Sequence, residues 1–237
     1  MARIPFTLRL ARWHVWLGWL IGLPVLMWTL TGLVMVSRPI EEVRGEHLRA
    51  EIEERVLPQQ LALPSIPDGL PRPVEVRFIA GDAGPVALAR YPDGSTQRFS
   101  GETGAPLPEI TASQARDVLA RQIAIDSQLV EIRRFDADDP PIDFRREIDV
   151  WRAQYEDGTR IYIGRDTGEV LAVRTRFWRT FDFMWGLHIM DLQTREDTSH
   201  PILILFAALG ALGSLIGIVL LFRRRKTQRK VMSRART

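Results

Sequence analysis

Four histidines carry the most specific chemistry in this chain of 237 residues. The chain has no cysteine, which excludes disulfides, iron–sulfur ligation by cysteine and the attachment motif of c-type haem. The absence of cysteine does not tell whether the protein faces an oxidising or a reducing compartment. Any metal ion or haem iron held by imidazole must therefore use these four side chains, which are His14, His47, His188 and His200.

Two of the histidines lie beside long apolar runs. His14 follows the start of residues 13–36, which carry no formal charge, and His200 directly precedes residues 201–222. Each run is long enough for a helix to cross a hydrocarbon core of roughly 30 Å. The first run lacks the shorter apolar region and small-residue cleavage site of a signal peptide. Both runs are therefore predicted to be transmembrane helices, and Pro201 suits the first helical position of the second.

Basic residues flank the two runs on the same side. Arg3, Arg9 and Arg12 precede the first run, and a dense basic cluster at residues 223–230 follows the second. Because such clusters stay in the cytoplasm, we expect both termini there and the middle of the chain outside, in the periplasm of a Gram-negative bacterium. The formal net charge is only +3, so we expect membrane lipid, and not nucleic acid, as a partner.

His188 lies in an aromatic-rich segment, residues 176–200, before the second run. The pattern predicts a helix lying in the membrane interface. His188 is in its apolar stripe, which also contains Phe177, Phe181, Met184 and Trp185.

Proline, threonine and glycine in the apolar runs predict how the helices pack. Pro24 should kink the first helix, and Thr29 and Thr31 could satisfy the freed carbonyls or contact another helix. Small residues four apart allow close helix approach, and a protein with two spans has little interior of its own. We therefore expect a homodimer or a larger membrane complex. The small pairs are Gly18 with Gly22 and Gly213 with Gly217.

The middle of the chain contains an internal repeat. Residues 91–104 and 155–168 both read Y-x-D-G-[ST]-x-x-x-[FI]-x-x-[ED]-T-G, 64 positions apart. Asp-Gly between alternating runs predicts a two-residue hairpin turn, and Thr-Gly closes a second turn. Each copy is therefore expected to have three strands, joined first by the Asp-Gly turn and then by the Thr-Gly turn. Residues 111–125 predict an amphipathic helix before the second copy, capped by Thr111 or Ser113.

Other parts of the middle region suggest no chemistry. Residues 41–55 predict a solvated charged helix, so His47 is not expected to be a ligand, and residues 58–73 are a proline-rich linker. The acidic loop at residues 136–139 either binds a cation or is simply solvated. No nucleophile–base set of a hydrolase is visible. No G-x-G-x-x-G follows a strand, so no flavin or NAD(P)H site is expected and an electron donor would be quinol or another protein.

The helix-plus-hairpin unit resembles a PepSY domain, and the flanking runs resemble the PepSY-associated transmembrane family. The first resemblance rests on Thr111–Ala115, Tyr155-x-Asp157-Gly158 and residues 164–170. The second rests on residues 13–18, 30–32, 187–191 and 200–201. The resemblance implies a haem-containing inner-membrane protein with a periplasmic PepSY module, related to proteins that reduce ferric siderophores in iron uptake. The chain departs from the larger members in having two spans instead of four or more.

The expected fold is therefore membrane α plus periplasmic α+β, with two transmembrane helices flanking a PepSY-like helix-plus-antiparallel-hairpin domain that contains a tandem repeat. The expected segments are a cytoplasmic N-terminus (1–12), transmembrane helix 1 (13–36), a linker with a degenerate PepSY-like repeat (37–110), a PepSY-like domain (111–175), an interfacial segment (176–200), transmembrane helix 2 (201–222) and a basic cytoplasmic tail (223–237).

Three histidines are then candidate ligands of haem b iron. His14 and His200 lie at opposite membrane faces, so within one antiparallel helix pair they cannot bind the same iron. His188 and His200 lie at the same face. In a two-fold dimer, His14 would share a haem with its symmetry mate, and His188 or His200 would hold a second haem. Arg12 and Arg179 are candidate partners of the haem propionates or of lipid headgroups.

Each histidine also has a structural alternative. His14 could be an interfacial anchor beside two tryptophans, His188 could bond a headgroup, and His200 could be a helix N-cap. The first functional hypothesis is a haem b membrane protein that passes electrons to a periplasmic acceptor such as a ferric siderophore. The second is a non-redox accessory subunit whose PepSY-like domain docks a protein partner.

Overall fold

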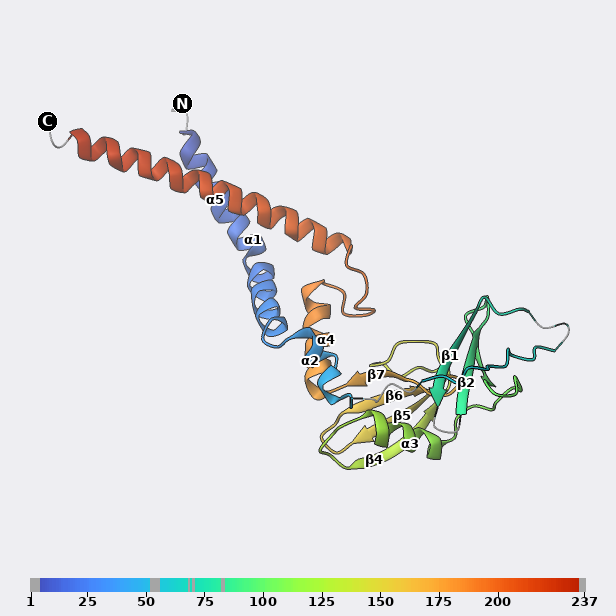
Figure 1. Ribbon diagram of the computed structural model, residues 1–237. Coiled ribbons are helices and arrows are strands. Elements are labelled where there is room, and N and C mark those ends of the chain that lie inside the picture. Colours follow the sequence, from blue (N-terminus) through green and yellow to red (C-terminus); the bar gives the residue numbers. More distant parts are fainter. Residues whose placement is uncertain (1–4, 52–55, 68, 70, 82–83, 235–237) are drawn as a thin grey trace. The chain divides into compact units, whose positions relative to one another are not determined.

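The computed structural model describes residues 5–51, 56–67, 69, 71–81 and 84–234, although not the side chains beyond Arg223. The chain divides into two units (Figure 1). The helical unit comprises residues 1–38 and 180–237, and the sheet unit comprises residues 39–179. Helix α4, Arg176–His188, begins in the sheet unit and ends in the helical unit.

Two helices of the helical unit are long and apolar enough to cross a membrane. They are α1, Phe6–Met35, and the Pro201–Arg223 part of α5, Pro201–Arg234. Only 17% and 6% of their most apolar windows are buried, so they are not core helices of a soluble protein. Helix α1 begins seven residues before the predicted start, and α5 begins at Pro201 as predicted.

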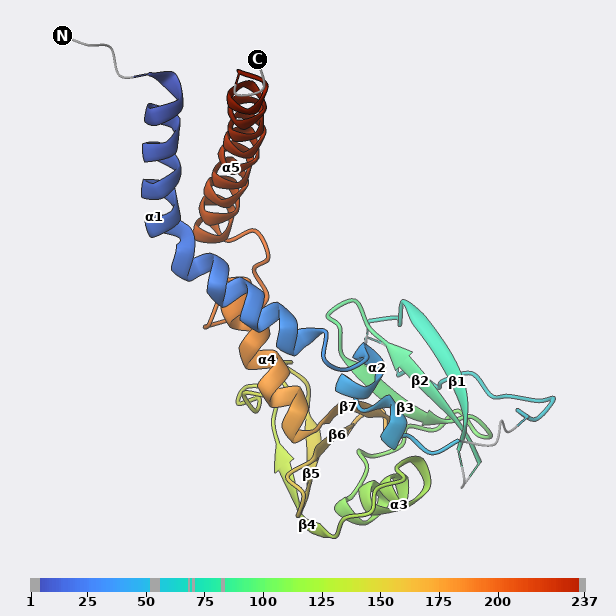
Figure 2. The ribbon, with the colours of Figure 1, turned by 90° about the vertical axis from the view of Figure 1, so that its left-hand side faces the viewer.

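Helix α1 changes direction part of the way along its length (Figure 2). Pro24 lies inside the helix, where it removes one backbone hydrogen bond and crowds the preceding turn, as the sequence predicted. The threonines do not repair that lost bond. The hydroxyl of Thr29 donates to the Val25 carbonyl at 2.9 Å, and that of Thr31 donates to the Met27 carbonyl at 2.8 Å. The other prediction for Thr31, contact with another helix, is confirmed below.

Helices α1 and α5 pack antiparallel through one of the two glycine pairs. A Cβ on Gly213 would lie 3.1 Å from Ile21, and a Cβ on Gly217 would lie 3.0 Å from the His14 ring. Gly18 and Gly22 instead have open space around them. The small pair on α5 therefore serves packing within the chain, while the small pair on α1 faces away from the described side chains.

The first half of the sheet unit is a three-stranded antiparallel sheet in the order β1-β2-β3. The strands are β1, Glu75–Gly81, β2, Gly84–Arg90, and β3, Thr96–Ser100. Its small core consists of Ala87, Ala89, Tyr91 and Phe99. Only an isolated bridge between Phe99 and Pro106 follows the Thr-Gly turn in the described chain, so the predicted third strand of this copy is wrong.

The second half is a four-stranded antiparallel sheet in the order β4-β5-β6-β7. The strands are β4, Leu129–Phe135, β5, Val150–Tyr155, β6, Arg160–Gly164, and β7, Val170–Arg174. Helix α3, Ala112–Gln122, packs Ala115, Val118 and Leu119 into the core of this sheet. Thr111 caps the helix in a capping box with Gln114, as predicted.

The Asp-Gly turns have one residue more than predicted. The Tyr155 amide donates to the Thr159 carbonyl, and the Gly158 amide donates to the Tyr155 carbonyl. The loop therefore has three residues, with only Gly158 at positive φ, +83°. A two-residue type I′ turn would need positive φ at both central residues. The equivalent bonds join Tyr91, Gly94 and Ser95 in the first hairpin.

The predicted helix at residues 41–55 is wrong where the chain is described. It is replaced by two short pieces, α2, Ile40–Val43, and the 3-10 turn η1, Glu46–Leu48. Gly45 interrupts them at φ +75°, and a Cβ there would lie 2.6 Å from Val173. Residues 52–55 lie outside the described residues, and His47 is exposed on η1.

Candidate functional site

His188 is held at both its backbone and its ring by one turn of α1. It is the last residue of α4. Its Nδ1 lies 2.9 Å from the Thr31 hydroxyl, and its carbonyl accepts a bond of 2.8 Å from the Trp28 indole. Its Cε1 lies 3.6 Å from the position that a Cβ on Gly32 would take. Thr31 is only 3% exposed, so water does not compete for these contacts.

The segment after His188 is ordered around a carboxylate. Asp191 accepts bonds from the Thr194 hydroxyl and from backbone amides of residues 193, 194, 196 and 197. The hydroxyl bond, followed by the amides, holds the pKa of Asp191 well below its ordinary value. Asp182 forms an ion pair with Arg195, whose carbonyl accepts from the Trp185 indole. These bonds tie the loop back onto α4.

His200 ends this loop and directly precedes α5. Its carbonyl accepts the first helical bond, from the Ile204 amide at 3.2 Å, so the predicted N-terminal position on the helix is confirmed. Its Nδ1 is buried and has no hydrogen-bond partner. An unpaired buried polar atom costs free energy, so the His200 Nδ1 has an unmet need for a hydrogen bond or a ligand.

His14 lies on the opposite part of α1 and packs on α5. A Cβ on Gly217 would lie 3.0 Å from its Cε1 and 3.4 Å from its Nε2. The His14 Nδ1 is buried without a hydrogen-bond partner. Seventeen residues separate His14 from Thr31, which is about 26 Å of helix rise. His14 and the His188 ring, which contacts Thr31, therefore lie near opposite ends of α1.

The two candidate arginines have different surroundings. Arg12 is exposed and precedes His14 by two residues, which puts it on nearly the opposite side of α1. Arg179 belongs to the sheet unit, where its guanidinium donates to the carbonyls of Gly158 and Arg174. Burial, together with nearby Arg160, lowers its pKa.

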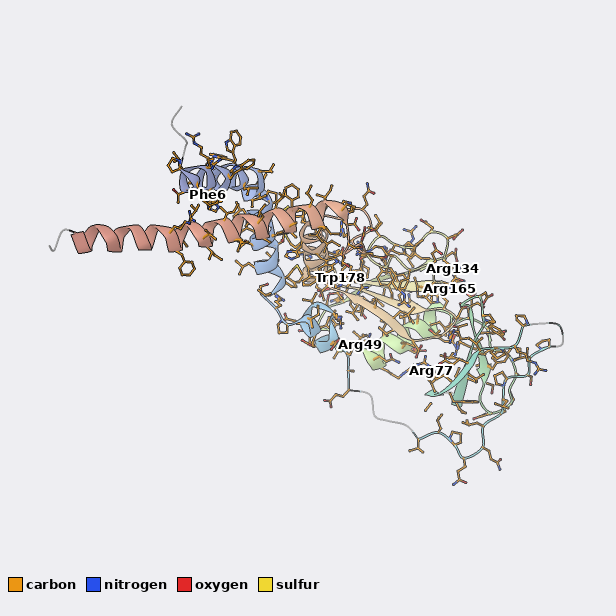
Figure 3. The ribbon with its side chains drawn as sticks, turned by 90° about the horizontal axis from the view of Figure 1, so that it is seen from above. Phe6, Arg49, Arg77, Arg134, Arg165 and Trp178 are labelled. Carbon is orange, nitrogen blue, oxygen red and sulfur yellow. The ribbon has the colours of Figure 1, made fainter. Side chains whose placement is uncertain are left out.

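The acidic loop uses its first carboxylate for an internal ion pair. Asp136 accepts from Arg165 at 2.5 Å and from Arg134, and these bonds lower its pKa, the Arg165 bond most. Figure 3 shows Arg134 and Arg165 side by side. Arg165 is 1% exposed, so a buried guanidinium of the protein itself pairs with the first carboxylate of this loop. Across the residues described, no group of three or more His, Asp or Glu could hold a metal ion.

Sequence reasoning missed the roles of Trp28 and Thr31 at His188. The signal was the Leu30-Thr31-Gly32 motif together with the expectation that Thr31 contacts another helix. The partner could not be named because Thr31 and His188 are 157 positions apart.

Two apolar helices that flank the sheet unit in the sequence make this a two-pass membrane protein with an α+β domain. Residues 11–237 match the family model described as the PepSY-associated TM region. The chain belongs to this family, and the resemblance drawn from its motifs is confirmed. No curated protein and no solved structure matches the chain.

Proposed function

We propose that this protein binds haem b in its helical unit and passes electrons across the bacterial inner membrane to a periplasmic acceptor such as a ferric siderophore. The observation that carries the proposal is the state of the three imidazoles in this unit. His14 and His200 each have a buried Nδ1 without a partner, and His188 has its Nδ1 engaged by Thr31. Each imidazole thus has a ring nitrogen without a described hydrogen bond, and the His188 ring is also oriented by Thr31.

The donor set fits haem b. Imidazole suits haem iron, and the absence of cysteine excludes thiolate ligation and covalent attachment. The haem would supply a one-electron iron couple when bound. The chain would hold one haem through His188 or His200 at one membrane face and a second haem through His14 at the other. Arg12 and Arg179 remain candidates for the propionates or for lipid headgroups.

A two-fold homodimer would complete the sites. His14 stands alone at its end of the helix pair, so a second imidazole there must come from another chain. Gly18 and Gly22, with open space around them on α1, allow a second helix to approach closely. The proposed assembly therefore shares one haem between the two copies of His14.

The proposed topology places both termini in the cytoplasm. The basic residues before the uncharged part of α1 and after the apolar part of α5 support this orientation, which would make the sheet unit periplasmic. The same backbone bonds in the hairpin turns at Tyr91 and Tyr155 support descent of the two sheets from a tandem PepSY repeat.

A second candidate function is a non-redox accessory subunit that docks a protein partner. An open groove of about 1050 Å³ in the sheet unit favours it. The groove runs between the three-stranded sheet and α3, with apolar Ile79, Val86 and Val118 beside Arg98 and Asp117. In this case the helices would be anchors, and the histidines would tolerate replacement.

An absorption spectrum of the detergent-purified protein, before and after dithionite, tests the proposal. We expect a Soret band and sharp reduced α and β bands of low-spin haem. A featureless spectrum from cells given ample haem contradicts the redox function. Gentle co-purification would then test for the protein partner.

A further inference from the structure

We infer that Thr31 is a positioning residue that fixes His188 in the Nδ1–H tautomer, so that Nε2 carries the lone pair that binds a ligand. The tautomer follows from hydrogen bonds within the helical unit alone. The identity of the ligand as haem iron rests on the proposed function.

The tautomer follows from counting protons at the Thr31 hydroxyl. Its oxygen lies 2.8 Å from the Met27 carbonyl, 3.1 Å from the Trp28 carbonyl and 2.9 Å from the His188 Nδ1. The hydroxyl has one proton, and a carbonyl can only accept. If that proton pointed to Nδ1, the hydroxyl oxygen would face a carbonyl oxygen at 2.8 Å with no proton between them. The hydroxyl therefore donates to the helix carbonyls and accepts from the Nδ1–H.

A neutral imidazole protonated at Nδ1 has its lone pair at Nε2. Metal-binding histidines usually donate their other ring N–H to an acceptor, which fixes the tautomer and the orientation of the ring. The Thr31 hydroxyl is such an acceptor, and its 3% exposure keeps water from replacing it. Thr31 thus prepares His188 for coordination before any ligand arrives.

The Trp28 indole fixes the backbone of the same residue. A carbonyl at the end of a helix has no partner within the helix, and the Trp28 Nε1 donates to that of His188. The ring and the carbonyl of His188 are therefore held separately by residues on one turn of α1. Loss of the Thr31 hydroxyl leaves the Trp28 bond in place, so a change in the ring need not displace α4.

Helix α1 offers a matched control for Thr31. Thr29 is two residues away and exposed, and its hydroxyl donates to the Val25 carbonyl at 2.9 Å. The control variant is Thr29→Val, and the test variant is Thr31→Val. Both replace a hydroxyl by a methyl group on the same helix, but only Thr31 contacts the histidine. Thr31→Ser keeps a hydroxyl at this position and should therefore keep the Nδ1–H tautomer of His188.

The first experiment measures the tautomer in the full-length protein without haem. Histidine is labelled with ¹⁵N, and the ring nitrogens are observed by NMR in detergent micelles, with His188→Ala used to assign the signals. We expect the Nδ1–H pattern at His188 in the wild type, Thr29→Val and Thr31→Ser. Thr31→Val should shift the population towards Nε2–H. An Nε2–H pattern in the wild type, or no change in Thr31→Val, overturns the inference.

The second experiment titrates haem b into the same proteins and follows the Soret band and the reduction potential. We expect Thr31→Val to weaken haem binding at the His188 end about 10- to 100-fold and to shift its potential. Thr31→Ser and Thr29→Val should match the wild type. Haem binding and potential unchanged in Thr31→Val overturn the role of Thr31 towards the ligand. A protein that shows the Nδ1–H tautomer but binds no haem overturns the proposed function and leaves the tautomer inference standing.

Discussion

The two ends of the helical unit hold their histidines in different ways. At one end, Thr31 and Trp28 hold the ring and the carbonyl of His188 by hydrogen bonds. At the other end, His14 packs against a glycine, Gly217, and its Nδ1 is buried without a hydrogen bond. The chain thus completes the orientation of His188 by itself, whereas His14 depends on shape and lacks a polar partner. In the proposed homodimer, a second copy would supply the partner that His14 lacks.

Removing either histidine should give the largest effect and should separate the two ends. We expect His14→Ala to lose the haem shared at its end and to keep the haem at the His188 end. His188→Ala should lose the other haem or change the ligation of its iron. The haem-to-protein ratio, measured by the pyridine haemochromogen method, checks both variants. Loss of all haem in each single variant would mean that the two ends do not hold separate haems.

Crowding the glycine should disturb only the His14 end. In Gly217→Ala the new Cβ would lie 3.0 Å from the His14 ring, so the ring or the helix must move. Gly210→Ala is the matched control, because nothing lies within 4 Å of its added Cβ. Both variants share the gain in helix propensity, so their difference isolates crowding. We expect Gly217→Ala to be less stable than the control by about 1–3 kcal/mol. Thermal unfolding in detergent measures this difference, and equal unfolding temperatures would contradict it.

Removing the charge of Asp191 should loosen only the end that contains His188 and His200. In Asp191→Asn, an NH₂ group replaces one carboxylate oxygen and faces N–H donors, so the loop loses acceptors. Because the folded protein lowers the pKa of Asp191, its carboxylate stabilises the fold above the ordinary pKa of about 3.9. That stabilisation is lost as the pH falls below 3.9 towards the lowered pKa.

We therefore expect the wild type to lose its advantage over Asp191→Asn in strongly acidic buffer and to keep it at pH 7. Unfolding temperatures across this range measure the effect. The control is Glu196→Gln, an exposed carboxylate of the same loop. An advantage that persists unchanged in strong acid would exclude the carboxylate as its source.

The smallest effect should come from the sheet unit and should leave both histidine ends unchanged. Thr111→Ala removes the cap of α3 and should cost about 1 kcal/mol. Ser113→Ala, at the other position considered for the cap, should cost almost nothing because Ser113 lies exposed inside the helix. Urea unfolding followed by circular dichroism measures both. A changed haem spectrum in Thr111→Ala would contradict the separation of the cap from the histidine sites.

Local features of the fold could be predicted from the sequence. The two spans follow from the length of the apolar runs, and the cap at Thr111 and the hairpin at Tyr155 follow from neighbouring residues. The charged helix at residues 41–55 failed because Gly45 packs against Val173, a residue distant in sequence. A local charge pattern contains no information about such a contact.

The candidate site was predicted in its residue types but not in its contacts. The sequence singles out His14 and His200 because they lie beside long apolar runs, and His188 because it lies in an apolar stripe. It cannot tell that Thr31 meets His188 while Thr29 does not, because that depends on which side of a bent helix faces α4. The same limit applies to the glycines, since a small-xxx-small pattern is equal in Gly18 with Gly22 and Gly213 with Gly217.

A single helix, α1, makes the histidine contacts at both ends of the helical unit. Both contacts therefore depend on the length of α1 and on the angular positions of its residues. His14, Ile21 and Trp28 are seven residues apart and lie on one stripe of the helix. One inserted residue would rotate everything beyond it by about 100° and take Thr31 away from His188. Seven inserted residues would restore the phase approximately but would lengthen the helix by about 10 Å. We therefore expect insertions and deletions to be absent between His14 and Gly32 in relatives that keep both histidines, even where lipid-facing side chains vary freely.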